Sequence, residues 1–248
     1  MPFRMQRRIA LATAALLGSL PGHGLHRLTS RAPSPWVPRF LAMAGRSFGL
    51  RVTIAGNPVR DHVLYAANHM SWLDILALGG ATGAAFVSKD DVSRWPIVGG
   101  LARIGGTIFV SRSDRAAVKG QADALGAALA SGRPAALFPE GTTGDGATLL
   151  PFRASLFASL DRAPPHVVVQ PVAIDYGAVA TQIAWTDCEG AGANARRVLS
   201  APGPIPVTLH FLDPIDPALG RKLIAAKARA EIEAALLESG TLLYSAAP

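Results

Sequence analysis

A histidine and an aspartate stand five residues apart in the segment NHMSWLD, residues 68–74. These residue types suit proton transfer, because a carboxylate fixes the tautomer of an imidazole and stabilises the ring once it is protonated. The other ring nitrogen then accepts a proton from a substrate. On one continuous helix, two side chains at this spacing would point about 140° apart. The two side chains can meet if His69 lies in the loop and Asp74 lies in the first turn of the following helix.

The same segment has a structural interpretation. Residues 71–74, Ser-Trp-Leu-Asp, match the pattern of a capping box, in which Asp74 closes the start of a helix. His69 is then an ordinary loop histidine with satisfied hydrogen bonds. This motif alone leaves the catalytic and the structural interpretation equally open.

A second segment, GGTIFVSR at residues 105–112, consists of an apolar run that ends at Arg112. A guanidinium just past the end of a strand suits a phosphate, because its planar fork of donors matches the oxygens. The simpler interpretation is a solvated arginine that pairs with Asp114.

A third segment, LFPEGTTGDG at residues 137–146, leads from an apolar run into a polar loop rich in glycine. Glycines allow backbone N–H groups to turn toward an anion, although a plain turn has a similar composition. The loop lacks the lysine and the spacing of a nucleotide-binding P-loop, and the chain has no Gly-x-Ser-x-Gly elbow typical of hydrolases.

The elements that must position these residues follow an α/β pattern from residue 51 onward. Short apolar runs indicate buried strands at 52–55, 63–67, 84–88, 107–110, 135–138, 167–174 and 207–211. Helical patterns lie at 72–78, 97–104, 115–130, 152–160 and 221–237. We expect residues 186–206, rich in proline and glycine, to form an excursion or a loop. This alternation predicts a largely parallel sheet flanked by helices, with the functional loops at the carboxyl ends of its strands.

Charge is distributed unevenly along the 248 residues. The net charge is +7, and residues 1–60 contain nine arginines but no lysine, aspartate or glutamate. The remainder carries 15 basic and 17 acidic residues and has no basic stripe or zinc-finger spacing, which argues against nucleic acid as a partner. Cys188 is the only cysteine, so intramolecular disulfides and cysteine-cluster zinc sites are excluded.

The N-terminal segment suggests contact with an anionic membrane surface. Three arginines precede an apolar stretch at residues 9–20, which we expect Pro21 and Gly22 to end. As a helix, this stretch spans roughly 18 Å, against about 30 Å of hydrocarbon, so it is too short to cross a bilayer. Residues 37–48 form a second amphipathic pattern.

Several interpretations of this segment stay open. A secretory signal would need a better cleavage site, and an organelle transit peptide would not usually contain so unbroken an apolar stretch. Helices at the membrane interface, with their arginines among the lipid headgroups, explain both the acid-free basic charge and the apolar stretch. Alternatively, both helices pack on the core of the protein itself.

Together, the three segments resemble the glycerolipid acyltransferases typified by 1-acyl-sn-glycerol-3-phosphate acyltransferases. His69 and Asp74 match the NHxxxxD block of that family, the segment ending at Arg112 matches GxxFxxR, and residues 138–142 match FPEGT. Residues 169–173 match a fourth block, apolar and containing proline, and Lys89 also has a counterpart in the family. The likeness runs from about residue 48 to residue 175.

The resemblance implies an O-acyltransferase that forms phosphatidic acid without a covalent acyl-enzyme, a cofactor or a metal. His69 would act as general base and Asp74 would orient it, while the acceptor oxygen attacks the thioester of acyl-CoA or acyl-carrier protein. Arg112, Glu140 and Gly141 would hold the polar head of a lysophospholipid acceptor, with Thr142 and Lys89 as further substrate-binding residues.

One departure from the family concerns the residue after FPEGT. Many relatives have an arginine there, whereas this chain has Thr143, and Arg153 is the candidate to supply the missing charge. A lyso-ornithine lipid or another lysolipid is an alternative acceptor, and a lipid-binding scaffold is the alternative outside enzymes. We expect residues 1–50 to associate with the cytoplasmic face of a membrane and residues 51–248 to form the acyltransferase domain, with the family motifs within 62–175.

Overall fold

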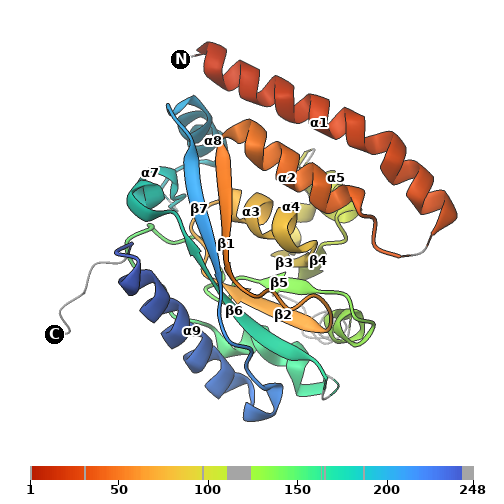
Figure 1. Ribbon diagram of the computed structural model, residues 1–248, viewed down its shortest axis with the longest axis vertical. Coiled ribbons are helices and arrows are strands. Elements are labelled where there is room, and N and C mark those ends of the chain that lie inside the picture. The colour runs from red at the N-terminus through yellow and green to blue at the C-terminus, as the bar shows by residue number, and fades with distance from the viewer. Residues whose placement is uncertain are drawn as a thin grey trace.

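One mixed sheet forms the centre of the protein (Figure 1). The computed structural model describes residues 2–30, 32–96, 98–110, 124–162, 164, 166–186 and 188–241. Within these residues the strands follow the order β1-β7-β6-β2-β5-β3-β4. Their bounds are β1 Leu50–Gly56, β2 Val63–Ala67, β3 Ala85–Lys89, β4 Ile108–Val110, β5 Ala135–Leu137, β6 Val168–Asp175 and β7 Ile205–Phe211.

Most neighbouring strands run parallel, as the sequence predicts. β2 lies between β5 and β6 and is parallel to both, and β1 is parallel to β7. The exception is the antiparallel pair β6 and β7. Each predicted strand corresponds to an observed strand, because short apolar runs buried on both faces have few other ways to hide their surface.

Helices cover both faces of the sheet. α2 (Trp36–Phe48) and α3 (Leu73–Thr82) lie on one side, and α9 (Arg221–Glu238), the 3₁₀ helix η1 (Ala154–Arg162) and the helical residues 124–130 lie on the other. β2 shows how the core divides. Val63, Tyr65 and Ala67 pack in the cluster that contains Leu73 and Leu78 of α3. Leu64 and Ala66 pack in the cluster that contains Leu129, Phe157 and Ile224.

Further helices lie between the strands and these helices in the chain. They are α4 (Asp90–Ser93), α5 (Val98–Ile104), η2 (Gly177–Val179), α7 (Ala180–Ile183), α8 (Ala191–Ser200) and η3 (Pro217–Leu219). The helix expected at 115–130 is present from residue 124, and its earlier part lies outside the described residues.

Two predictions are wrong. The first helix, α1 (Pro2–Thr29), continues through Pro21 instead of ending there. Its packing on α2 explains this, because the indole of Trp36 fills the space where a side chain at Gly22 would lie. Within 186–206, residues 191–200 form α8 rather than a loop. Side-chain contacts from distant elements hold α8, so local sequence did not reveal it.

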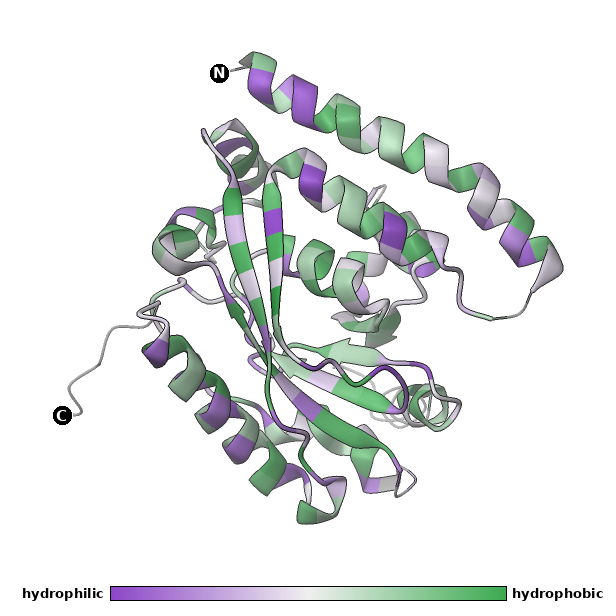
Figure 2. Cartoon of the chain, viewed as in Figure 1, coloured by the Kyte–Doolittle hydropathy of each residue, from purple (hydrophilic) through white to green (hydrophobic). Residues whose placement is uncertain are grey.

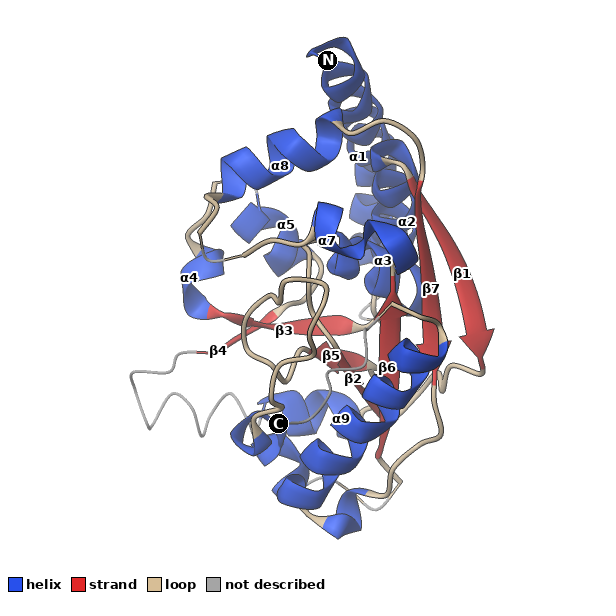
Figure 3. Cartoon of the chain, turned by 90° about the vertical axis from the view of Figure 1, so that its left-hand side faces the viewer, coloured by secondary structure: helices blue, strands red, loops and turns tan. Residues whose placement is uncertain are grey.

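The N-terminal helix forms an outer layer beside α2 and α8 (Figure 3). Arg8 of α1 is buried and donates to the carbonyl oxygens of Val198, Leu199 and Gly203, at the C-terminal end of α8. Among the described residues, no helix combines the length and the apolar character that a membrane span needs.

Candidate active site

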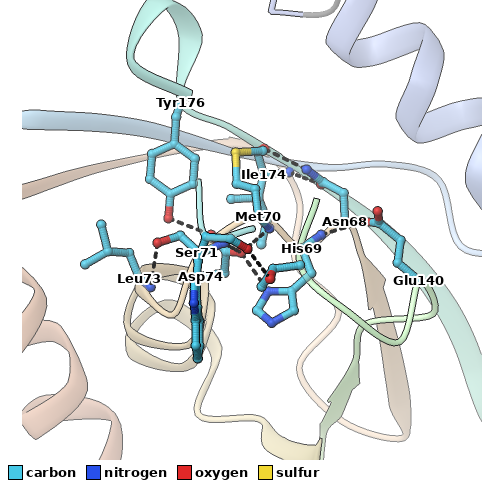
Figure 4. A network of polar contacts seen from close by, with 11 residues as sticks. Asn68, His69, Met70, Ser71, Leu73, Asp74, Glu140, Ile174 and Tyr176 are labelled. Atoms are coloured by element: carbon cyan, nitrogen blue, oxygen red, sulfur yellow. Dashed lines mark hydrogen bonds and ion pairs between the residues drawn. The ribbon is translucent and has the colours of Figure 1, made fainter. Parts of the chain in front are cut away.

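The site lies where three adjacent parallel strands end. β2 leads into Asn68 and His69, β5 leads toward Glu140, and β6 leads into Tyr176. Parallel strands place their carboxyl ends at one edge of a sheet, which is where open α/β folds bind ligands. Segments more than 100 residues apart in sequence therefore meet around one histidine (Figure 4).

His69 and Asp74 are in direct contact. The Nδ1 atom of His69 lies 2.8 Å from the Oδ2 atom of Asp74, with the histidine in the loop and the aspartate in the first turn of α3. The side chain of Asp74 is fully buried, whereas the side chain of His69 is 16% exposed to solvent. Because Nδ1 is occupied, Nε2 is the ring nitrogen left for a substrate.

Asp74 accepts four hydrogen bonds from the described residues. Its Oδ2 also accepts the backbone N–H groups of Met70 and Ser71, each at 2.9 Å. Its Oδ1 accepts the hydroxyl of Tyr176 at 2.7 Å. The bond from Ser71 is the half of a capping box that the sequence suggested. The structural and the catalytic interpretation are thus compatible, since the same carboxylate closes the turn and holds the imidazole.

Asn68 joins the loop to the end of β6. Its amide donates to the carbonyl oxygen of Ile174 at 3.0 Å and accepts the N–H of Ile174 at 2.7 Å. Such a two-point contact restrains both translation and rotation of the backbone just before His69. Asn68 belongs to the quoted motif, but sequence reasoning assigned it no role.

Glu140 supports the same loop from β5. Its Oε1 accepts the backbone N–H of His69 at 2.7 Å, and its Oε2 accepts the N–H of Leu150 at 3.1 Å. The side chain is buried, and this desolvation raises the pKa of Glu140 to about 7. Both oxygens are therefore engaged with backbone, an arrangement that suits loop positioning better than the headgroup contact expected from sequence.

The loop after Glu140 packs against the histidine. Gly141 has a positive φ of 76° and donates its N–H to the carbonyl oxygen of Phe138, while Gly144 donates to the carbonyl oxygen of His69 at 2.7 Å. Thr142 is half-buried in this loop. Thr143, the departure from the family pattern, donates its hydroxyl to the carbonyl oxygen of Trp185.

The cationic candidates are less well defined. Arg153 is exposed and its backbone N–H donates to Pro139. Lys89 is the last residue of β3, but its side chain and the whole of Arg112 lie outside the described residues. Headgroup binding by these three residues stays a prediction.

Two side chains that sequence reasoning missed complete the site. Phe138 stacks on His69, and Tyr176 follows the fourth block by three residues. Phe138 stood in a quoted motif without a role, whereas no local signal marked Tyr176. Among the described residues, no group of three His, Cys, Asp or Glu side chains is placed to hold a metal ion.

Comparison with known proteins identifies relatives of this site and fold. A family model described as Acyltransferase matches residues 50–175, which confirms the resemblance. A lyso-ornithine lipid O-acyltransferase of Rhizobium meliloti (strain 1021) is 39% identical over 189 residues, which is 73% of this chain and 62% of that protein. A 1-acyl-sn-glycerol-3-phosphate acyltransferase of Neisseria gonorrhoeae is 37% identical over 138 residues, covering 54% and 52%.

The fold also has a solved counterpart. The crystal structure of the 1-acyl-sn-glycerophosphate acyltransferase PlsC from Thermotoga maritima matches with a TM-score of 0.66 over 94% of this chain and 95% of that chain. At 22% identity, this likeness concerns the fold. The chain spans about three fifths of the length of the lyso-ornithine lipid acyltransferases of Rhizobium meliloti, Rhodobacter capsulatus and Pseudomonas aeruginosa.

Proposed function

The chain belongs to the Acyltransferase family, and we propose that it transfers a fatty acyl group from a thioester to the free hydroxyl of a lysolipid. The observation that carries this proposal is the 2.8 Å contact between His69 and Asp74 inside the NHxxxxD block that follows β2. A buried carboxylate on one ring nitrogen and a partly exposed ring are what general-base catalysis at a hydroxyl requires.

In the proposed reaction, His69 first accepts a proton and later returns it, so the pair of His69 and Asp74 ends in its starting state. His69 takes the proton of the acceptor hydroxyl at Nε2 as the oxygen attacks the carbonyl carbon of the thioester. Asp74 stabilises the imidazolium that forms. The tetrahedral intermediate then collapses by breaking the carbon–sulfur bond, and the thiolate of coenzyme A or acyl-carrier protein takes the proton back from His69. No acyl-enzyme forms and no cofactor is consumed.

For the acceptor, two lysolipids come into consideration. Relatives named lyso-ornithine lipid O-acyltransferase align over 66–73% of the chain, and the relatives named 1-acyl-sn-glycerol-3-phosphate acyltransferase align over 54%. Thr143 in place of the family arginine also removes a cation that a phosphomonoester, with its charge near −2, would use. We therefore place lyso-ornithine lipid first, and lysophosphatidate, the acceptor that the sequence motifs alone suggested, second.

A membrane surface is the proposed place of reaction, since a soluble thioester and a lipid acceptor must meet. The exposed side chains of α1 include Phe3, Leu17 and Leu28, and Arg4 and Arg7 are exposed near its start. Figure 2 shows α1 along the outside of the protein, with hydrophilic positions near its N-terminus followed by hydrophobic ones. An apolar helix face bordered by arginines suits the interface of an anionic bilayer. α2, by contrast, lies between α1 and α3 and packs on the core. The cytoplasmic face is the proposed side, because acyl-CoA and acyl-carrier protein are available there.

The test supplies labelled acyl-CoA or acyl-carrier protein with both lysolipids in equal amounts and separates the products by mass spectrometry. Label in either diacyl product supports the enzyme proposal, and the ratio of products identifies the acceptor. Lipid binding by the wild-type chain without any transfer would instead support a non-catalytic scaffold.

A further inference from the structure

We propose that Tyr176 is a positioning residue of this active site, whose hydroxyl orients the carboxylate of Asp74 toward His69. The inference rests on the proposed acyl transfer, and it concerns a residue outside the four family blocks. Figure 4 shows the phenol above Asp74, with its hydroxyl oxygen directed at the carboxylate. The two oxygens of Asp74 therefore have separate partners, with Tyr176 on Oδ1 and His69 on Oδ2.

Burial makes this hydrogen bond important. Asp74 has no exposed surface and Tyr176 only 1%. An ionised carboxylate removed from water is stable only where donors replace the lost solvation. Within the described residues, Tyr176 is the one donor to Oδ1, so its removal leaves that oxygen without a partner.

The phenol also keeps its proton under working conditions. Desolvation raises the pKa of Tyr176 well above its usual value, and the adjacent negative charge of Asp74 and their hydrogen bond raise it further. Tyr176 therefore remains a donor over the pH range in which an imidazole titrates.

The backbone fixes Tyr176 relative to the histidine loop. Ile174 is bonded twice to Asn68, which directly precedes His69. Asp175 accepts the N–H of Gly177 at 2.7 Å, which stabilises the turn on the other side of Tyr176. The end of β6 and the histidine loop are thus joined twice, by the contacts of Asn68 with Ile174 and by the contact of Asp74 with Tyr176.

A pH profile distinguishes orientation from simple packing. Among the residues that the structure describes, the titratable groups that contact or face the His69–Asp74 pair are Tyr176 after β6 and Glu140 after β5, with Arg229 of α9 acting on Glu140. The hydroxyl stabilises the carboxylate most strongly when the imidazole is neutral, because the negative charge is then least compensated. Its loss therefore favours protonation of the pair and shifts the acid limb of kcat/KM to higher pH.

The experiment compares Tyr176→Phe with wild type in the acyl-transfer assay from pH 5 to pH 9. We expect kcat to fall about ten- to a hundredfold and the acid limb to move up by about one pH unit, as the loss of one charge-assisted hydrogen bond implies. Tyr65→Phe is the matched control, because Tyr65 is equally buried but donates to Val59 away from the histidine. This control should lower stability and leave the acid limb in place.

A second measurement does not depend on turnover. NMR titration of the His69 ring, assigned by comparison with His69→Gln, should give a higher midpoint in Tyr176→Phe than in wild type or Tyr65→Phe. If wild type transfers acyl groups but Tyr176→Phe keeps both its acid limb and its ring midpoint, the positioning role is wrong. If wild type transfers nothing but the midpoint moves, positioning holds and the proposed function fails.

Discussion

The imidazole ring of His69 lies nearly flat on the phenyl ring of Phe138, with ring centroids 3.9 Å apart and an angle of 10° between the planes. Phe86 of β3 lies beyond, 5.8 Å from Phe138 at 18°. Asp74 therefore contacts one edge of the His69 ring, and one face of the ring packs on Phe138, the residue that follows β5. An aromatic face attracts a cation, so this stack favours the imidazolium formed during proton transfer.

Replacing Phe138 with leucine should reduce kcat without preventing folding. A cation–π contact of about 0.5–2 kcal/mol corresponds to roughly a two- to thirtyfold loss in rate. Because the imidazolium loses its aromatic neighbour, the acid limb of kcat/KM should move to lower pH, opposite to the shift expected for Tyr176→Phe. Steady-state rates across pH measure both effects.

Phe157→Leu provides the control for lost volume. Phe157 is fully buried in the cluster on the other face of the sheet, away from His69. This variant should lose at least as much stability as Phe138→Leu, because Phe138 is only partly buried, and it should keep the pH profile of wild type. A Phe138→Leu profile identical to that of Phe157→Leu would contradict a role for the stack.

His69→Gln separates chemistry from architecture better than Asp74→Asn does. A positioned base contributes about 10²–10⁴ in rate, so His69→Gln should lose at least a hundredfold in kcat with little change in Tm, since its side chain is partly exposed.

Asp74→Asn should lose activity and stability together. An amide cannot replace a carboxylate that accepts four hydrogen bonds, and an unsatisfied buried group costs about 1–3 kcal/mol.

Circular dichroism melting and the transfer assay check both variants. Full activity in His69→Gln would overturn the general-base proposal. An unchanged Tm in Asp74→Asn would show that the loop bonds of Asp74 contribute little to stability.

How much the sequence revealed depended on the range of the interactions. The strands were predictable because burial on both faces requires continuous apolar runs, and the first turn of α3 was predictable from its capping pattern. Pro21 led to a wrong prediction of the end of α1, because local sequence does not show that α2 packs against α1 beyond this proline. α8 was missed because its contacts come from Arg8 and from Trp72, whose indole donates to Asn194.

The same contrast applies to the site. His69 and Asp74 are five positions apart, so a motif displays their relationship directly. Tyr176 is 102 residues from Asp74, and no spacing rule connects them. Glu140 lay within a quoted motif, but its role in holding the N–H of His69 depends on the adjacency of β2 and β5, which only the folded sheet shows.

Glu140 should make stability depend on pH. Its pKa is raised from 4.5 to about 7 in the folded state, so between these values the folded protein binds more protons than the unfolded chain. The contribution of Glu140 is therefore most favourable below pH 4.5 and is lost as pH rises toward 7, by about 2–4 kcal/mol. Urea unfolding at several pH values, compared with Glu140→Gln, measures this difference.

The control for Glu140 is an exposed carboxylate. Glu238→Gln, near the end of α9, should show the same pH dependence of unfolding as wild type. If Glu140→Gln also follows the wild-type curve, burial does not perturb this group in solution.

Two neighbouring arginines should have different roles in α1. Arg8 donates to three carbonyl oxygens at the end of α8, so Arg8→Ala should loosen the docking of α1 and speed limited proteolysis at residues 30–35 by about tenfold or more. Arg7 is exposed, and Arg7→Ala should leave the cleavage rate unchanged. Gel analysis over time measures the rates, and equal rates for both variants would contradict the docking role of Arg8.

The outward face of α1 should bind anionic vesicles through both apolar and basic side chains. Leu17 and Leu28 are 61% and 86% exposed, and fully burying a leucine side chain in an apolar phase is worth about 1.5–3 kcal/mol. Leu17→Ser with Leu28→Ser should therefore weaken sedimentation with acidic vesicles at least tenfold. Leu223→Ser should not, although Leu223 of α9 is 60% exposed and so matches Leu17. Arg4→Ala with Arg7→Ala should lose about 1 kcal/mol per arginine at low salt and less at high salt, because ions screen the attraction. Vesicle binding that is insensitive to the leucine pair but lost in Leu223→Ser would place the membrane contact on α9 instead.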